Sequence, residues 1–342
     1  MDTASPFGTH RAVDPAGALP YQAKRLDLSL PLKPGELLID VERLNIDSAS
    51  MTQLAAAHGH DPERVGAAID AIVETCGKMH NPVTGSGGML IGRVAAVGPD
   101  TAKPLAQVGD RIATLVSLTT TPLRLDRIDN VDLTSHQVVV KGQALLFENS
   151  LLAVLPDDLP ETLVLAALDV CGAPAQTHRL VGPDDRVLII GAGGKSGILC
   201  TYVAAKQVRD PRQVIAFDYK DEIVARAAEA APGVTTMVGD ATDAVGLMLA
   251  VSAATDHAMV DLVINCVNVP NTEMACILAT KDRGRIYFFS MATNFQAAAL
   301  GAESVGQDID MLIGNGYARG HADFTLDLLR ESEVLRRLLQ GR

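Results

Sequence analysis

The chain has 342 residues, of which 48% are hydrophobic and 20% are charged, and its formal net charge is −12. This length and composition are typical of a globular protein with room for two domains, and they exclude a disordered chain. The sequence has no clustered lysines and arginines, which binding to a phosphate backbone requires, so we expect no nucleic-acid partner.

The cysteines are odd in number, widely spaced and without a CxxC pair, which favours free thiols in a reducing compartment. They are Cys76, Cys171, Cys200, Cys266 and Cys276. No apolar run approaches the roughly 18 residues that span a bilayer. The N-terminal segment lacks the basic and apolar regions of a secretory signal. We therefore expect a cytoplasmic protein without a membrane partner.

Residues 1–155 contain short strand-like runs separated by Pro, Gly, Asn and Asp, which predicts a β-rich domain. Strands are predicted over 35–44, 87–98 and 109–118. One helix is well marked within this region. Asp61 is a candidate N-cap, Pro62 stands at the first helical position, and Gly77 follows the last apolar residue as a stop.

From about residue 156 the pattern changes to apolar runs that alternate with helix-like segments. The apolar runs are 186–191, 213–218, 235–239, 261–267 and 284–290. The helix-like segments between them are 195–208, 220–230, 241–254 and 270–281, and an amphipathic helix is predicted near 322–340. Strands buried on both faces and alternating with helices predict a doubly wound parallel sheet.

The segment 191–197, with the sequence GAGGKSG, bears on the kind of nucleotide that this second region binds. A triphosphate-binding loop needs a glycine five positions before Gly194, but that position is Ile189. A dinucleotide-binding turn fits better, because the glycines follow a predicted strand and open a predicted helix. Glycine lets the backbone turn sharply and approach a pyrophosphate at the helix N-terminus.

An acidic residue supports the dinucleotide interpretation. Asp218 ends the next predicted strand, 21 residues after Gly197, where a carboxylate accepts the ribose hydroxyls of NAD and repels the 2′-phosphate of NADP. The neighbouring Lys220 keeps NADP open as an alternative. The predicted cofactor-binding residues are Gly191, Gly193, Gly194, Lys195, Ser196, Gly197, Asp218, Tyr219, Lys220, Asp240, Cys266 and Val267.

A glycine turn in mid-chain, after a β-rich domain, resembles the medium-chain dehydrogenase/reductase superfamily. The matching segments are 32–47, 92–112, 155–160 and 182–197. The resemblance implies an α/β fold with a GroES-like β-rich catalytic domain and a Rossmann doubly wound parallel-sheet domain. It assigns 1–155, with a C-terminal return over 300–342, to the first domain and 156–299 to the NAD-binding domain. It also implies a substrate in the cleft between the domains and a homodimer.

The zinc-dependent members of that superfamily have metal ligands that this chain lacks. A ligand cysteine is replaced within Asn45-Ile46-Asp47-Ser48, a Gly-His-Glu motif is replaced by Gly87-Gly88-Met89, and a third ligand would fall near Ala166. A catalytic zinc needs three protein ligands, so we predict no metal.

Longer and less common strings resemble the L-erythro-3,5-diaminohexanoate dehydrogenase family. They are 6–11, 79–92, 191–197, 291–303 and 313–322. The resemblance implies NAD-dependent oxidative deamination of a diamino acid at C3. The products would be 5-amino-3-oxohexanoate and ammonia, in lysine fermentation.

Such a reaction needs a group that controls whether the amine is protonated, and it needs acidic side chains that bind the amine. Asp169 is our first candidate for an amine anchor, because it interrupts the apolar run 163–175, where an unpaired charge is costly; a turn-capping carboxylate is the alternative. The polar loop 79–88 supplies further candidates, with a plain surface loop as the alternative. They are His80, as the acid or base, and Asn81, Thr84 and Ser86.

Asp47 replaces part of a metal-ligand segment, and it is either a site residue or the N-cap of a helix that starts near Ser48. Arg11 is a candidate for bidentate pairing with the substrate carboxylate. Other polar residues in glycine-rich contexts fit a surface or a subunit contact as well as a site. They are His10, Asn315, Tyr317 and His321.

Two other functions remain open at this point. One is a zinc-free NAD(P)H quinone or enal reductase of the same superfamily, against which Asp169, Asp218 and the polar loop 79–88 count. The other is a catalytically inactive, NAD-sensing binding protein, which no residue of the sequence excludes.

Overall fold

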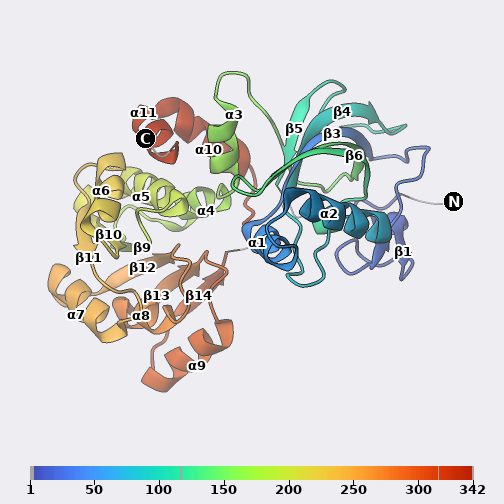
Figure 1. The fold of residues 1–342 in the computed structure, drawn as a ribbon. Helices are drawn as coiled ribbons and strands as arrows, with labels where there is room; N and C mark the ends of the chain where they lie inside the picture. Colours follow the sequence, from blue (N-terminus) through green and yellow to red (C-terminus); the bar gives the residue numbers. More distant parts are fainter. Residues whose placement is uncertain (1–3, 116–117, 315, 341–342) are drawn as a thin grey trace. The chain divides into compact units, whose positions relative to one another are not determined.

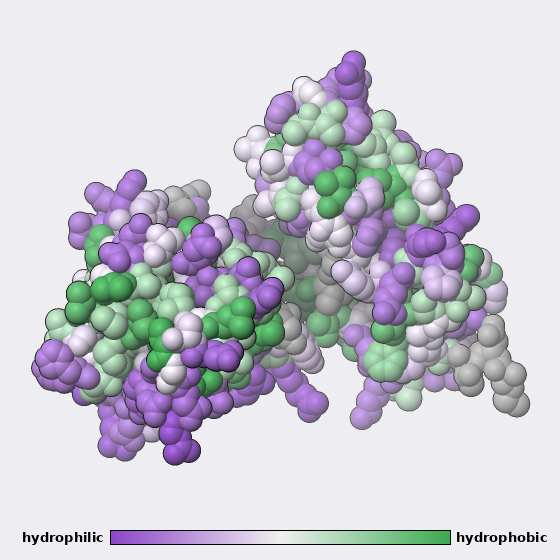
Figure 2. All heavy atoms as spheres, turned by 90° about the horizontal axis from the view of Figure 1, so that it is seen from below, coloured by the Kyte–Doolittle hydropathy of each residue, from purple (hydrophilic) through white to green (hydrophobic). Residues whose placement is uncertain are grey.

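The computed structural model describes residues 4–115, 118–314 and 316–340. The chain forms two compact units, and the boundary between them falls between Asp158 and Leu159. Each unit has a sheet and a hydrophobic core of its own, and Figure 1 labels most of the elements of both. On the face of each unit that Figure 2 shows, hydrophilic residues are interspersed with small groups of hydrophobic ones.

The first unit is built on a six-stranded antiparallel sheet of order β6-β7-β3-β4-β5-β8. Its strands are β3 (Leu37–Asn45), β4 (Met89–Val97), β5 (Arg111–Thr114), β6 (Leu123–Asp132), β7 (Gln137–Leu146) and β8 (Leu152–Val154). A separate antiparallel ladder joins β1 (Ala12–Asp14) and β2 (Arg25–Leu26), and short 3₁₀ turns cover Thr9–Arg11 and Leu118–Thr120. The three strands predicted in this region correspond to β3, β4 and β5, and the β-rich domain is confirmed.

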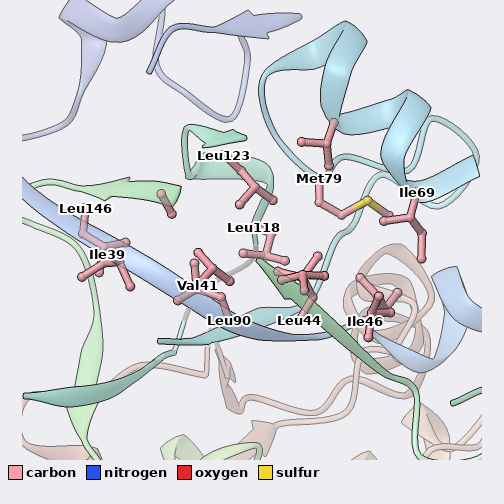
Figure 3. Packing of buried hydrophobic residues seen from close by; sticks show 14 of the residues in the cluster. Ile39, Val41, Leu44, Ile46, Ile69, Met79, Leu90, Leu118, Leu123 and Leu146 are labelled. Atoms are coloured by element: carbon pink, nitrogen blue, oxygen red, sulfur yellow. The ribbon is translucent and has the colours of Figure 1, made fainter. Parts of the chain in front are cut away.

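The marked helix of the first unit is α2 (Pro62–Cys76), and its ends are those predicted. The Asp61 carboxylate accepts hydrogen bonds from two backbone amides of the first turn, and Gly77 ends the helix with a φ of 61°. Ile69 of α2 is buried together with Met79 and the inward residues of the sheet (Figure 3). The helix α1 (Ser48–Ala57) precedes α2, and the sequence had offered a helix starting near Ser48 as one of two alternatives for the role of Asp47.

The second unit contains a six-stranded parallel sheet of order β11-β10-β9-β12-β13-β14. Its strands are β9 (Val187–Ile190), β10 (Val214–Asp218), β11 (Thr235–Val238), β12 (Val260–Asn265), β13 (Thr280–Phe288) and β14 (Asp310–Ile313). All four residues of β9 are buried, which explains the near-continuous apolar run. The chain reverses its direction of travel across the sheet between β9 and β12, as in a Rossmann fold.

Helices cover both faces of the parallel sheet and connect its strands (Figure 1). They are α3 (Glu161–Leu168), α4 (Gly172–Leu180), α5 (Lys195–Gln207), α6 (Asp221–Ala230), α7 (Ala244–Ala254), α8 (Glu273–Ala279), α9 (Phe295–Val305), α10 (His321–Glu331) and α11 (Glu333–Leu339), with a 3₁₀ turn at Pro211–Gln213. The long helix predicted near 322–340 is two helices, because Ser332 leaves the helical conformation and caps α11. No helix of the described residues has both the length and the apolar character needed to cross a bilayer.

The C-terminal segment lies with the second unit. We predicted that 300–342 returns to the first domain, but β14 extends the parallel sheet, α10 packs on α3 and α4, and α11 packs on α6. The apolar sides of these two helices, including Leu329 and Leu335, are fully buried. Hydrophobic burial on neighbouring helices therefore accounts for where this segment lies.

A buried ion pair between Arg11 and Glu36 holds the N-terminal segment of the first unit. Arg11 is 3% exposed and Glu36 is 1% exposed. Arg11 donates from Nε to Glu36 Oε1 at 2.7 Å and from Nη2 to Glu36 Oε2 at 2.7 Å. Its remaining N–H groups donate to Asp27 and to the carbonyl oxygens of Ser29 and Pro31.

All five N–H groups of Arg11 thus have acceptors inside the protein. We therefore withdraw the substrate-carboxylate role that the sequence suggested for Arg11. The sequence could not reveal the pairing, because Arg11 and Glu36 are 25 positions apart. Burial alone would raise the pKa of Glu36, but hydrogen bonds, led by that from Arg11, bring it below its ordinary value.

We expect Glu36→Gln to lower the free energy of unfolding by about 3–5 kcal/mol, because it leaves the Arg11 cation buried without its counter-ion. Chemical denaturation at neutral pH measures this loss. The matched control is Glu331→Gln, which removes an exposed partner of Lys206 and should cost about 0–1 kcal/mol. The lowered pKa makes the Glu36 contribution full above pH 4.5 and lost as the pH falls further. Equal losses in the two variants would contradict the buried pair.

Candidate functional site

The predicted glycine turn lies where the parallel sheet of the second unit reverses its strand order. It follows β9 directly and ends in α5, whose first residue is Lys195. Gly194 occupies the N-cap of α5 without a side-chain cap, so the first amides of the helix keep no side-chain acceptor there. A helix N-terminus at the carboxyl end of a central parallel strand is where such sheets bind the phosphates of a dinucleotide.

Glycine is required at three positions of this turn because backbone atoms of other residues lie where a side chain would begin. Gly191 has a φ of 79°, which side chains rarely adopt. A Cβ on Gly193 would lie 2.1 Å from the carbonyl oxygen of Ile223, and one on Gly197 would lie 2.0 Å from that of Gly191. Gly194 differs, because its nearest neighbour would be 3.5 Å away.

Asp218 ends β10 beside the turn and is 6% exposed. Its Oδ2 accepts a hydrogen bond from the Gly193 amide at 2.9 Å, and its Oδ1 accepts one from the Tyr219 amide at 2.8 Å. Arg226 of α6 donates to the Gly193 carbonyl oxygen at 2.8 Å and to that of Leu338 in α11. Asp218 therefore fixes the turn, and each of its oxygens retains a lone pair that could accept a hydroxyl.

The other predicted cofactor residues surround this turn at the ends of neighbouring strands. Cys266 and Val267 follow β12, and the Val267 backbone leaves no room for a side chain at Gly191. Asp240 follows β11, is exposed, and accepts hydrogen bonds from the Thr242 amide and hydroxyl. Tyr219 and Lys220 follow Asp218 directly; Tyr219 is 62% exposed, and the Lys220 Nζ lies 5.1 Å from the Tyr219 ring centroid. Ser196 is the second residue of α5.

Asp169 lies at the C-terminal end of α3 with its side chain 58% exposed, and its Oδ2 is 3.2 Å from the Lys195 Nζ. The premise that this carboxylate is buried in an apolar run is therefore wrong. The apolar residues before it face the interior from α3, while Asp169 is on the outside. The contact does bring Asp169 to the first residue of the dinucleotide helix, which the sequence did not reveal.

A second polar cluster, which we call the Asp47 cluster, lies in the first unit. It consists of Asp47, Ser50, Gln53, Asn81 and Thr84. Asp47 caps α1 by accepting from the Ser50 amide through Oδ1 at 2.9 Å, which confirms the alternative reading of this residue. Its Oδ2 is buried, and no described residue forms a hydrogen bond with it. A carboxylate oxygen in that state is costly unless a donor reaches it, which makes it a candidate acceptor for a ligand.

Contacts across the Asp47 cluster join α1 to the loop 79–88. The Ser50 and Thr84 hydroxyls are 2.6 Å apart, and Asn81 Nδ2 donates to Gln53 Oε1 at 2.8 Å. Ser86 takes part through its backbone, because its carbonyl oxygen accepts from the Asn81 amide. Ser50 and Gln53 are not among the residues that the sequence predicted for a site. Their spacing from Asp47 along one helix was the available signal.

His80 lies apart from these hydrogen bonds. Its ring packs edge-on to Tyr21, with 6.4 Å between centroids, and burial and the nearby Lys78 lower its pKa. Tyr317 and His321 form a ring pair in the second unit, and Asn315 lies outside the described residues. Across the described ranges, no group of three or more His, Cys, Asp or Glu side chains is placed to hold a metal ion.

Comparisons with known proteins give the family. The family model described as the L-erythro-3,5-diaminohexanoate dehydrogenase N-terminal domain matches residues 10–156. The L-erythro-3,5-diaminohexanoate dehydrogenase of Fusobacterium nucleatum is 52% identical over 339 residues, which is 99% of this chain and 98% of that protein. The protein of the same name from Acetoanaerobium sticklandii is 49% identical over 96% of each chain. The chain belongs to the L-erythro-3,5-diaminohexanoate dehydrogenase family.

Solved structures extend the comparison to the fold. A quinone oxidoreductase from Pseudomonas syringae has a TM-score of 0.56 at 17% identity and covers 92% of this chain and 89% of its own. An alcohol dehydrogenase from Thermus sp. ATN1 has a TM-score of 0.52 at 19% identity, with coverage of 93% and 91%. The fold is therefore that of the medium-chain dehydrogenases/reductases, as the sequence predicted.

Membership of the L-erythro-3,5-diaminohexanoate dehydrogenase family makes this chain an oxidoreductase that acts on an amino group of a small molecule. In such a dehydrogenase, the Rossmann-like unit is where a nicotinamide dinucleotide would bind. The glycine turn and Asp218 fit that cofactor in shape and chemistry. The family gives no residue roles for the Asp47 cluster, so those rest on its geometry.

We expect Gly197→Ala to destabilise the second unit by about 1–3 kcal/mol, because the new methyl group meets the Gly191 carbonyl oxygen. Gly194→Ala is the matched control in the same turn, and its methyl group meets no protein atom closer than 3.5 Å. Thermal denaturation without cofactor compares them. If the two variants lost the same stability, the tight packing of this turn would be disproved.

Proposed function

We propose that this enzyme oxidises L-erythro-3,5-diaminohexanoate at C3 with NAD and releases ammonia, giving 5-amino-3-oxohexanoate. The observation that carries the proposal is identity of about half the residues, over nearly the whole chain, with two relatives of that name. An activity of this kind serves the fermentation of lysine. The five cysteines, none of which forms a disulfide, fit the reducing cytoplasm.

The reaction removes a hydride, which carries two electrons, from C3. The amine at C3 must first lose its proton, so that its lone pair can form the C=N bond as the hydride leaves. A bound nicotinamide would be the hydride acceptor. Water then adds to the imine carbon, and loss of ammonia leaves the ketone. The protein must therefore bind a molecule with two amines and one carboxylate, and hold one amine neutral.

Asp218 supports NAD as the preferred cofactor. Its carboxylate is held by the Gly193 and Tyr219 amides at the end of β10, where the adenosine ribose of a dinucleotide lies in this fold. A 2′-phosphate would meet this negative charge in a buried place. Lys220, beside it in sequence, packs over Tyr219 and does not pair with Asp218 in the described contacts.

Asp218→Asn keeps the size of the side chain and removes its charge. We expect KM for NAD to rise at least tenfold, since charge-assisted hydrogen bonds to the ribose are lost, and KM for NADP to rise less or to fall. Initial rates with both cofactors measure the ratio. Asp221→Asn, in the first turn of the following helix, is the control and should leave the ratio within about twofold. An equal rise in KM for NAD and for NADP would show that Asp218 does not bind the ribose.

The Asp47 cluster supports binding of a cationic amine of the substrate. The buried Oδ2 of Asp47 lacks a donor, and an ammonium group supplies one together with the opposite charge. The paired Ser50 and Thr84 hydroxyls and the amides of Asn81 and Gln53 surround it with further polar groups. We assign Asp47 to holding the amine that is not oxidised. His80 and Asp169 remain candidates for the proton transfer at C3.

Asp47→Asn retains the cap of α1 through its Oδ1 but removes the charge. We expect KM for the diamino acid to rise by about tenfold to a hundredfold, because a charged hydrogen bond contributes roughly 1.5–3 kcal/mol. KM for NAD should stay unchanged. The matched control is Asp61→Asn at the N-cap of α2, whose carboxylate accepts two exposed hydrogen bonds from backbone amides. An unchanged KM in Asp47→Asn would exclude the assignment.

The activity itself is tested with purified protein, L-erythro-3,5-diaminohexanoate and NAD. We expect NADH absorbance to rise and ammonia to appear in equal amount. Treatment with a strong chelator should leave the rate unchanged, in keeping with the predicted zinc independence. Reduction of quinones or enals with NADPH in place of this reaction would reject the proposal, and NAD binding without turnover of any amino acid would indicate a sensor.

We also propose a homodimer. β14 is an edge strand of the parallel sheet in the second unit, and Ile313 at its end is 60% exposed. An unpaired edge with apolar side chains is a ready place for a second copy of the chain. Size-exclusion chromatography with light scattering gives the mass, and a monomer at micromolar concentration would refute this.

A further inference from the structure

A pocket of about 510 Å³ in the first unit lies between α2 and the segment Tyr21–Lys24. Its size is within the range of small-molecule sites. Its walls include Ile72 of α2 and Pro82, and its charged or titratable lining residues are Lys24, Lys78, His80, Tyr21 and Cys76. No Asp or Glu lines it, although the chain as a whole has twelve more acidic than basic residues. The pocket is therefore locally suited to an anion.

Lys78 provides a buried cation in this pocket. Its side chain is 1% exposed, and its Nζ donates to the carbonyl oxygens of Pro20 at 2.7 Å and Tyr21 at 3.4 Å. These acceptors are neutral, and among the described residues no carboxylate forms an ion pair with it. Burial lowers the pKa of Lys78 to about 8. A buried ammonium without a counter-ion is costly, and a bound anion would offset that cost.

His80 provides a second group without a partner. Its Nδ1 is buried and has no hydrogen-bond partner among the residues that the structure describes, while its ring is held against Tyr21. Met79, between Lys78 and His80, is fully buried in the core of the unit (Figure 3), which fixes the position of this stretch of chain. Lys78 and His80 thus stand on either side of Met79, and both residues border the same apolar-walled pocket. A carboxylate has two oxygens with which to meet them.

We propose that this pocket binds the carboxylate of a short aliphatic acid, with Lys78 as the counter-ion, His80 as a second hydrogen-bond donor and Ile72 and Pro82 against the hydrocarbon chain. The apolar wall selects a carbon chain over inorganic anions. The acid is either the substrate itself or a separate metabolite of the same chemistry. The inference does not depend on the proposed reaction, because binding is measured without turnover.

The experiment is calorimetric titration of the full-length protein, without cofactor, using hexanoate as the probe and hexanamide as its neutral analogue. We expect saturable hexanoate binding with a millimolar or lower Kd, and binding of hexanamide at least tenfold weaker. Lys78→Met, which keeps the length of the side chain, should weaken hexanoate binding at least tenfold. Lys24→Met is the matched control, because Lys24 lines the same pocket with an 81% exposed side chain, and it should change Kd by less than threefold.

If Lys78→Met does not fold, His80→Phe keeps the ring against Tyr21, removes the donor and should weaken binding at least threefold. Competition then identifies the source of the acid. Displacement of hexanoate by L-erythro-3,5-diaminohexanoate assigns the pocket to the substrate carboxylate, and simultaneous binding assigns it to a second ligand. Failure of hexanoate to saturate the protein, or equal affinity in the Lys78 and Lys24 variants, would overturn the inference whether or not the enzyme deaminates its substrate.

Discussion

The close approach of backbone to backbone at the glycine turn is the constraint on which the second unit depends. The carbonyl oxygen of Gly191 lies where a side chain of Gly197 would begin, and the Gly193 amide reaches the carboxylate of Asp218. One short segment therefore fixes the start of α5, the end of β10 and the place of a negative charge. The backbone of this turn is already in place before a dinucleotide binds. Little of the protein would therefore need to become ordered on binding.

The first unit carries a cluster of polar side chains in the residues that the structure describes. In the Asp47 cluster, hydroxyl, amide and carboxylate groups from the start of α1 and from the loop 79–88 form hydrogen bonds with one another. The exception is Asp47 Oδ2. An amine substrate can supply both the missing proton donor and the positive charge, whereas a hydride transfer from an alcohol would call for neither.

The first unit has two buried cations, Arg11 and Lys78, that differ in their hydrogen-bond partners. The difference indicates which of the two holds the fold and which is available to a ligand. Arg11 is fully neutralised by Glu36, and all its donors are used, so it holds the fold and has nothing left for a ligand. Lys78 is as deeply buried, but within the described part of the chain its hydrogen-bond acceptors are two backbone carbonyl oxygens. Because both are cations of low exposure, their roles are distinguished by their partners.

The sequence by itself determined the two-part α/β architecture, the capped helix α2 and the glycine turn with Asp218. Each of these depends on local spacing: apolar periodicity, a cap within a few residues, or a strand that leads into a glycine turn. Tertiary structure alone decided the partner of Arg11, the exposure of Asp169, the place of the C-terminal helices and the isolation of Lys78. Those features depend on residues distant in sequence and on which side of a helix faces solvent, and no local pattern carries that information.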